Sequence, residues 1–315
     1  MRRVFSLAVL ALLTACGSAL GGDATANASG AVTAEQTSPP TLRTQPVAPA
    51  SAPLSGPPKP EPAGPVNFTY AGELTQGGWI RGIVPRGTVK AFLDDTPLEI
   101  GSDNRYFAAF DRDAGSTATL RAELASGGTQ TARLTITPRQ WNIERVNVAR
   151  RSGGASASFM QRRQPELDAI WDARLKFTGA TGYRQDFIWP VKGRISGTFG
   201  SQRIYRGEPG SYHSGIDIAP GDGVPFVSPA DGVVVLARTN FSLEGQLLII
   251  DHGAGLNSAF LHASKLAVAE GDVVRQGQYL GNIGSSGRAT GPHLHWSLKW
   301  RNSRLDPLLF TGPMN

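Results

Sequence analysis

The sequence predicts a mainly β protein made of antiparallel strands, and three patterns support this fold class. Residues 293–300 alternate polar and apolar side chains, which is the period of a strand with one face toward a core. Residues 66–140 contain short alternating runs separated by Gly and Asp turns, a pattern typical of a small antiparallel β-sandwich. One amphipathic stretch, 165–176, has the helical period and lies between the two β regions.

The composition excludes several other classes of protein. The 315 residues contain 38 Gly, 22 Pro and a single Cys, and only 18% of them are charged. These proportions exclude a coiled coil, a collagen and a multispanning membrane protein. The formal net charge of +6 suits an anionic polymer, and no nucleic-acid partner is expected. Because one Cys cannot form an intramolecular disulfide, any metal site must consist mainly of His and carboxylate ligands.

The N-terminus has the order of residues found in a bacterial lipoprotein signal peptide. Arg2 and Arg3 precede an apolar run at 4–13, which is shorter than the roughly 20 residues of a bilayer-spanning helix. The run leads into Leu-Thr-Ala-Cys, which resembles a lipobox and implies that Cys16 is acylated; an ordinary signal peptide containing a cysteine is the alternative. Acylation implies an extracytoplasmic protein with a lipid anchor in the membrane. By resemblance to the lipoproteins of diderm bacteria, Gly17 in place of Asp favours the outer membrane, with the protein facing the periplasm.

The stretch after the cysteine predicts a flexible tether. Residues 17–65 contain ten Pro, five charged residues and no aromatic residue. Such a stretch cannot bury enough apolar surface to offset its ordering entropy. In the β-sandwich that follows, we expect strands at 79–84, 89–93 and 131–137, with turns at the Gly and Asp pairs between them.

The connector between the two β regions is expected to be partly helical. Pro165 suits the first helical position, acidic residues follow in the first turn, and basic residues occupy the last turn before 176. One apolar face is expected to pack on one of the two domains. Its members are Leu167, Ile170, Trp171 and Leu175. A lid that mimics substrate is the alternative.

Four of the five His lie in three short contexts, at positions 213, 262 and 293/295. On the alternating strand, His293 and His295 project from the same face, about 6.6 Å apart. One can therefore bind a metal while the other stands beside it. His213 and Asp217 are four residues apart, and Gly215 allows the chain to bend so that both reach one ion. Two imidazoles and a carboxylate leave a fourth zinc position open, as in catalytic sites. The alternative is that each His is a satisfied core or surface residue.

The segment at about 187–307 resembles the lysostaphin-type (LytM) zinc metallopeptidases. The resemblance implies an antiparallel β catalytic domain with a groove and one zinc ion per catalytic domain. It also implies that the enzyme cleaves peptide cross-links of bacterial peptidoglycan. The stretches that carry it are 193–200, 213–217, 229–234, 250–253, 261–264 and 291–296. The predicted division is a signal peptide at 1–15, a tether at 16–65, a β-sandwich at 66–140, a connector at 141–186 and a peptidase domain at 187–312.

The resemblance also assigns roles to individual residues. It implies that His213, Asp217 and His295 bind the zinc ion. His262 and His293 fall at the catalytic positions, where they orient and deprotonate the attacking water. The cleaved bond is expected to join D-alanine to diaminopimelate, and a glycyl-glycine bond is the other chemistry of the family.

Three positions near these motifs carry further predictions. His252 also matches the family and is expected to be structural, because the open site needs only the other four His. Tyr212 and Arg288 flank the metal motifs and are candidates for contacts with substrate in the groove.

Two other functions are compatible with parts of the sequence. Some LytM-type proteins lack zinc and activate cell-wall amidases, but those usually lose one or more ligand positions, and here all are present. The repeats at 221–224 and 271–274 echo biotinyl and lipoyl carrier domains, yet no Lys occupies the expected hairpin tip. The first β domain is either a spacer or a wall-binding or positioning module. The sequence does not decide whether the enzyme is latent or whether a regulatory protein partner activates it.

Overall fold

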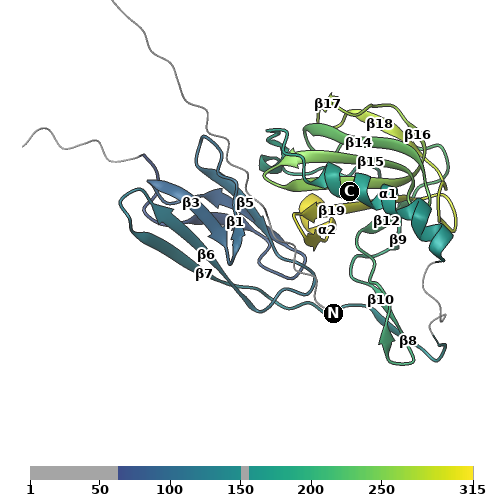
Figure 1. Ribbon diagram of the computed structural model, residues 1–315, viewed down its shortest axis with the longest axis horizontal. Helices are drawn as coiled ribbons and strands as arrows, with labels where there is room; N and C mark the ends of the chain where they lie inside the picture. The colour runs from purple at the N-terminus through teal and green to yellow at the C-terminus, as the bar shows by residue number, and fades with distance from the viewer. Residues whose placement is uncertain (1–62, 150–155, 315) are drawn as a thin grey trace, which may run out of the picture. The chain divides into compact units, whose positions relative to one another are not determined.

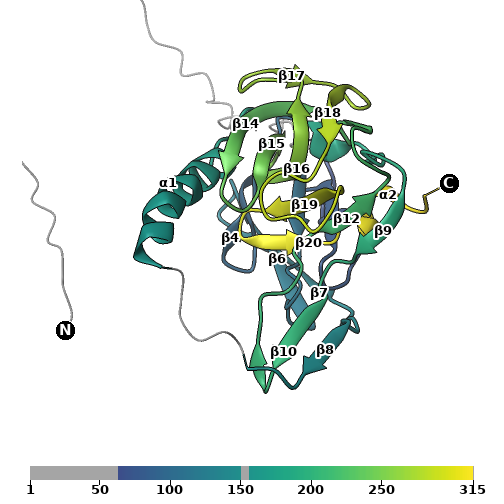
Figure 2. The same cartoon turned by 90° about the vertical axis from the view of Figure 1, so that its right-hand side faces the viewer.

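The computed structural model describes residues 63–149 and 156–314, which fall within a compact unit from Lys59 to Asn315. The predictions for the signal peptide, Cys16 and the tether up to residue 62 therefore lie outside the described residues. The described elements are mainly β, which confirms the predicted fold class (Figures 1 and 2). Within these ranges, no helix has the length and apolar character needed to cross a membrane.

The N-terminal part forms two small antiparallel sheets, and the alternating runs predicted from the sequence are among their strands. In β6, Ala118, Leu120 and Ala122 are buried and alternate with more exposed side chains, as expected for a strand with one face toward the core. A three-stranded sheet has the order β1 (Thr69–Gly72), β2 (Trp79–Ile83) and β5 (Arg105–Ala109). A four-stranded sheet has the order β4 (Thr96–Pro97), β3 (Thr88–Leu93), β6 (Thr117–Leu124) and β7 (Thr129–Thr135).

The C-terminal part is a ten-stranded antiparallel sheet with the central order β17-β14-β15-β16-β19-β12-β9. Outside this path, β13 pairs with β18, β18 with β16, and β20 with β19. The strands are β9 (Arg194–Gly197), β12 (Ile216–Ala219), β13 (Pro225–Val227), β14 (Gly232–Phe241), β15 (Gly245–Gly253), β16 (Leu256–Leu266), β17 (Val273–Val274), β18 (Tyr279–Ile283), β19 (Leu294–Trp300) and β20 (Ser303–Leu305).

A third small sheet lies where the sequence predicted only a connector. β8 (Ile143–Val146) pairs in parallel with β10 (Gln202–Tyr205), which also pairs with β11 (Glu208–Pro209). Four residues are too few to display a period of two, so the sequence pattern of β8 is not recognisable. The pairing ties the start of the connector to the C-terminal part of the chain.

The predicted helix exists, but its boundaries are wrong. α1 spans Ala157–Arg174, so Pro165 lies inside the helix and not at its first position. The N-cap is Ser156, whose hydroxyl accepts the backbone N–H of Phe159 at 3.1 Å. A proline inside a helix removes one backbone hydrogen bond, which the tertiary contacts of α1 must offset.

The predicted packing face of this helix is also largely wrong. Leu167, Trp171 and Leu175 are 38%, 51% and 53% exposed. The helix lies along β14 and β15 instead, with Ala173 buried and Ile170 partly buried against them (Figures 1 and 2). Small residues allow this close approach. The strongest anchor is polar, because the buried guanidinium of Arg163 forms two hydrogen bonds with the Glu244 carboxylate, at 2.6 and 2.7 Å.

Aromatic packing makes the hydrophobic core continuous between the small sheets and the large sheet. The short helix α2 (Leu308–Thr311) carries Phe310, whose ring centroid lies 5.1 Å from that of Trp79 and 5.3 Å from that of Phe187. The indole N–H of Trp79 donates to the carbonyl of Leu309 at 2.9 Å. The 3-10 helix η1 (Gly182–Arg184) places Tyr183 against Phe107 in the same core.

Candidate metal centre

Strand pairing brings the predicted metal ligands together. In the antiparallel pair β12–β19, Asp217 lies directly opposite His295, so both side chains project from the same face. His213 reaches them from the loop before β12, and Gly215 permits this path. A Cβ at Gly215 would lie 2.4 Å from the carbonyl oxygen of Trp296, so the position requires glycine.

The three side chains form a tight triangle of donor atoms. His213 Nε2 lies 3.1 Å from Asp217 Oδ1 and 3.1 Å from His295 Nδ1, and the last two atoms are 2.8 Å apart. The other nitrogen of His213 faces the carbonyl oxygen of Thr198 at 3.1 Å, so Nδ1 carries the proton. The Nε2 lone pair of the neutral ring therefore points into the triangle.

This donor set fits a zinc ion. Ligand atoms of a tetrahedral zinc site, each about 2.0 to 2.1 Å from the metal, lie about 3.3 Å from one another. The triangle is close to that spacing, and two imidazoles with one carboxylate leave the fourth position open. Among the described residues, only His213, Asp217 and His295 form such a group of ligand atoms.

The electrostatics of the triangle also favour a cation. Burial raises the pKa of Asp217, but hydrogen bonds from His213 and His295 outweigh burial and hold that pKa well below its usual range. Burial lowers the pKa of His295, so its ring is neutral near pH 7. Burial also lowers the pKa of His213, but the hydrogen bond with Asp217 reverses this and raises it. A metal at this site would displace that proton.

The two predicted catalytic His stand beside the triangle. The Nδ1 atom of His293 lies 2.8 Å from the Gly291 carbonyl oxygen, and that of His262 lies 2.8 Å from the Ser286 carbonyl oxygen. A carbonyl only accepts, so in each neutral ring Nδ1 donates and Nε2 keeps a lone pair. The two ring centroids are 4.9 Å apart, and His293 Nε2 lies 3.7 Å from Asp217 Oδ1. Burial lowers the pKa of His262, which keeps it neutral and able to accept a proton.

His262 owes its orientation to an irregularity in β16. The register with β15 shifts between Gln246 and Leu248, and His262 has a φ of +67°, which is uncommon for a residue with a Cβ. Its backbone N–H donates to the carbonyl of Glu244 at 2.9 Å. Because Arg163 of α1 holds the carboxylate of Glu244, the helix braces the segment that positions this ring. No sequence pattern indicates the bulge.

The five site residues open onto a groove. A cavity of about 360 Å³ is lined by all five site residues and by Arg288. A neighbouring cavity of about 1100 Å³ is lined by Tyr212, His213 and Arg288. Both predicted substrate contacts thus lie on the groove, and their roles stay predictions. The wall also includes residues of the connector that sequence reasoning missed, namely Asn142, Glu144, Val148 and Ala149.

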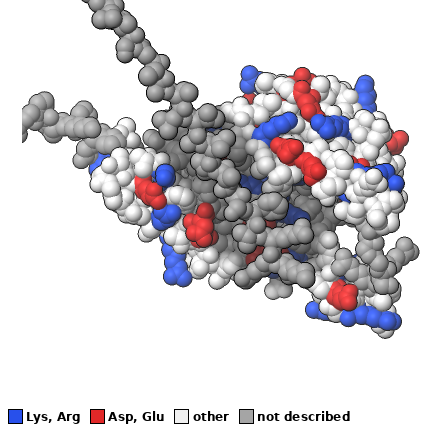
Figure 3. Space-filling model, viewed as in Figure 1, with Lys and Arg blue, Asp and Glu red and all other residues white. Residues whose placement is uncertain are grey.

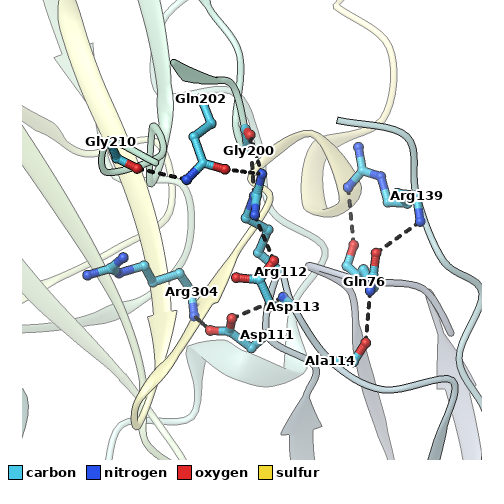
Figure 4. A network of polar contacts seen from close by, with 10 residues as sticks. All are labelled: Gln76, Asp111, Arg112, Asp113, Ala114, Arg139, Gly200, Gln202, Gly210 and Arg304. Carbon is cyan, nitrogen blue, oxygen red and sulfur yellow. Dashed lines mark hydrogen bonds and ion pairs between the residues drawn. The ribbon is translucent and has the colours of Figure 1, made fainter. Parts of the chain in front are cut away.

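Arg112, a buried arginine in the loop after β5, contacts the segment at Gly200 and Gln202 (Figure 4). Arg112 donates to the carbonyl of Gly200 from Nη2 at 2.9 Å and from Nε at 3.3 Å, and its guanidinium lies over the ring of Tyr212. The backbone N–H of Gly200 in turn donates to the carbonyl of His213 at 2.9 Å, and the His213 N–H donates to Ser201 at 2.8 Å. The small sheets therefore contribute to the position of a candidate metal ligand.

The fifth histidine lies outside this site. His252 is fully buried, its Nδ1 lies 2.8 Å from the Asp231 carbonyl oxygen, and its Nε2 lies 2.7 Å from the Ser258 hydroxyl. Burial lowers the pKa of His252 to about 4. The ring is thus a neutral part of the core.

Comparison with protein families agrees with this geometry. Residues 211–307, which include all five site residues above and Tyr212, match the model of Peptidase family M23. This segment belongs to peptidase family M23.

Individual curated proteins resemble the chain over part of its length. It is 38% identical over 132 residues to the peptidoglycan DD-endopeptidase ShyA of Vibrio cholerae, covering 40% of this chain and 30% of that protein. It is 34% identical over 124 residues to the lipoprotein NlpD/LppB homolog of Pseudomonas aeruginosa, covering 39% of each. The chain therefore matches less than half the length of these curated relatives.

One solved structure extends the likeness beyond the M23 segment. A crystal structure of a candidate M23 peptidase from Pseudomonas aeruginosa superposes with a TM-score of 0.58 at 25% identity. The superposition covers 76% of this chain and 96% of that one. The shared fold is therefore larger than residues 211–307.

Proposed function

We propose that the protein is a zinc-dependent endopeptidase that hydrolyses peptide cross-links of peptidoglycan. The observation that carries this proposal is the complete set of His213, Asp217 and His295, with His262 and His293 beside it. The M23 segment and the name of the Vibrio cholerae relative, a peptidoglycan DD-endopeptidase, support the substrate class. The bond that we expect the enzyme to cleave joins D-alanine to diaminopimelate.

We propose that His213, Asp217 and His295 hold one zinc ion. The bound ion supplies Lewis-acid chemistry, polarising the scissile carbonyl and lowering the pKa of water from 15.7 toward about 7. His262, whose lowered pKa keeps Nε2 unprotonated, accepts a proton from the attacking water. The proton that His262 accepts from water is then given to the leaving amine. His293, with Nδ1 held by the Gly291 carbonyl, would stabilise the developing oxyanion by a hydrogen bond from Nε2 when Nε2 carries a proton.

We also propose that Cys16 is lipidated and that the protein is anchored in the outer membrane, facing the periplasm. A peptidoglycan hydrolase must lie outside the cytoplasm, which agrees with a signal peptide at 1–15. Replacement of Cys16 by Ser should release the protein from the membrane fraction into the soluble fraction. An unchanged membrane fraction would contradict the anchor and leave the enzymatic proposal unaffected.

The enzymatic proposal is tested by digestion of purified cross-linked peptidoglycan with the zinc-loaded chain. Muropeptides are resolved by mass, with a chelator control and His262→Ala as the matched inactive variant. We expect conversion of cross-linked dimers to monomers, lost on chelation and restored by zinc. A chain that holds zinc and yields no product would contradict the enzymatic proposal. It would favour instead an activator of cell-wall amidases, which the addition of an amidase then tests.

A further inference from the structure

A second cavity adjoins the candidate metal centre. It has a volume of about 480 Å³ and shares Ser214, the neighbour of His213, with the cavity over the metal ligands. Ser297 and Lys299 line it from β19, on the same face as His295 because the residues alternate. Lys299 lies four residues beyond His295, or about 13 Å along the strand. This cavity, which we name the cationic pocket, is also lined by Arg174, Arg304 and Asp168.

Three cationic side chains line the cationic pocket, and the carboxylate of Asp111 accepts the backbone N–H of Arg304 at 2.8 Å. Across residues 63–149 and 156–314, the side chains of Arg174, Lys299 and Arg304 form no ion pair. Arg174 donates a hydrogen bond to the amide oxygen of Asn257, a neutral side chain, at 2.8 Å. The one carboxylate in the wall, Asp168, accepts a hydrogen bond from Gln164.

These cations act on one another. Burial first, and then the charges of Arg174 and Arg304, lower the pKa of Lys299 to about 8. For Arg174, burial and then the charge of Arg304 lower the pKa to about 10. Each group is therefore held near like charges at some cost in free energy, which an anion between them would relieve. On the face drawn in Figure 3, basic and acidic side chains are interspersed.

We infer that the cationic pocket binds a carboxylate group of the peptidoglycan stem peptide. Arginine and lysine together offer the donors that recognise carboxylates, and partial burial strengthens such contacts. An extended peptide that lies along β19 with its scissile bond at the metal centre reaches Lys299 within about four residues. Diaminopimelate carries two carboxyl groups, so a cross-linked stem has free carboxylates within that distance. This inference rests on the proposed function.

Recognition of a carboxylate in this pocket would make the enzyme prefer peptidoglycan with free stem carboxylates over peptidoglycan in which those groups are amidated. Stems with a free carboxylate would bind through the cations, whereas amidated stems would leave those cations unpaired. Because the contact lies away from the reacting atoms, we expect it to act mainly on KM and not on kcat.

The test compares two cross-linked muropeptide dimers that differ only in whether the diaminopimelate carboxylate is free or amidated. We expect the wild-type chain to cleave the free acid with a kcat/KM about tenfold or more above that for the amide. Lys299→Gln should remove most of this preference through KM, with zinc content unchanged. Lys90→Gln, an exposed lysine on β3, is the matched control and should behave as wild type.

The outcomes separate the inference from the function on which it rests. Equal cleavage of both dimers by the wild-type chain would overturn the inference and leave the endopeptidase intact. If the zinc-loaded wild type cleaves neither dimer, the proposed function fails. The binding of the two dimers is then measured by calorimetry, and equal affinities for both would overturn the inference. The wild-type comparison also decides the question if Lys299→Gln does not fold. Equally tight binding of inorganic phosphate in place of either dimer would assign the pocket to a free anion and would likewise overturn it.

Discussion

Gly197 on β9 offers a sharp test of the metal centre, because it has no room for a methyl group. A Cβ at this position would lie 2.4 Å from Asp217 Oδ2 and 3.1 Å from Cε1 of His213, and real Cβ atoms essentially never approach below 3.0 Å. The carboxylate must therefore retreat by about 0.6 Å or more. Turning Oδ2 away also turns Oδ1, the oxygen that faces both imidazoles.

A displacement of this size exceeds the about 0.2 Å within which metal–ligand distances are held. We therefore expect Gly197→Ala to weaken zinc binding about 10- to 100-fold, the range seen when the support of a metal ligand is lost. The assay is competition for zinc against a chromophoric chelator, with thermal unfolding as a check on the fold. Gly291→Ala is the matched control, since a Cβ there would contact nothing within 4 Å. Equal zinc affinity in Gly197→Ala and wild type would refute the geometry described for Asp217.

Three further predictions follow from the site and its supports. His295→Ala should lose zinc while His293→Ala keeps it, and equal zinc loss in both, measured by elemental analysis, would contradict the separate roles. Arg112→Ala should lower the free energy of unfolding by about 1.5 to 3 kcal/mol and also weaken zinc binding, because the buried guanidinium holds the Gly200 carbonyl. A loss of stability with unaltered zinc affinity would show that Arg112 does not support the loop that carries His213. For His252, burial lowers the pKa in the folded chain to about 4, below the ordinary value of 6.5, so the unfolded chain binds the extra proton between these two pH values. The free energy of unfolding should therefore fall as pH drops from 6.5 toward 4, by roughly 3 kcal/mol at most, and His252→Gln should show a shallower slope in denaturant titrations; identical slopes would exclude His252 as the titrating group.

The strands that the sequence predicts well are those with one buried face. Alternation is visible in residues 293–300 and in the runs that became β2, β3 and β7, because a half-buried strand must place every second side chain in the core. β8 escaped detection because its four residues are stabilised by pairing with β10, which lies about sixty residues away. Local pattern carries no information about such a partner.

The helix shows the opposite failure. Its existence follows from helical period and charged end residues, but its start depends on Ser156 and its packing on Arg163, which pairs with Glu244 across 81 residues. An apolar stripe at 167–175 therefore predicted a buried face, whereas α1 packs through its small residues and buried arginine and leaves Trp171 half exposed. An ion pair with the distant turn between β14 and β15 anchors this helix.

For the candidate site, the sequence by itself determined the inventory of chemistry. An open zinc site was predicted from three features: two imidazoles on one strand face, the spacing of His213 and Asp217, and the presence of a single Cys. Only the tertiary structure decided the geometry: the β12–β19 register that sets Asp217 against His295, and the bulge that turns His262 toward them. The tertiary structure alone also placed the cations at 174, 299 and 304 around one pocket. Spacing along a chain determines which residues share a face, but contacts between strands depend on register, which many distant side chains decide together.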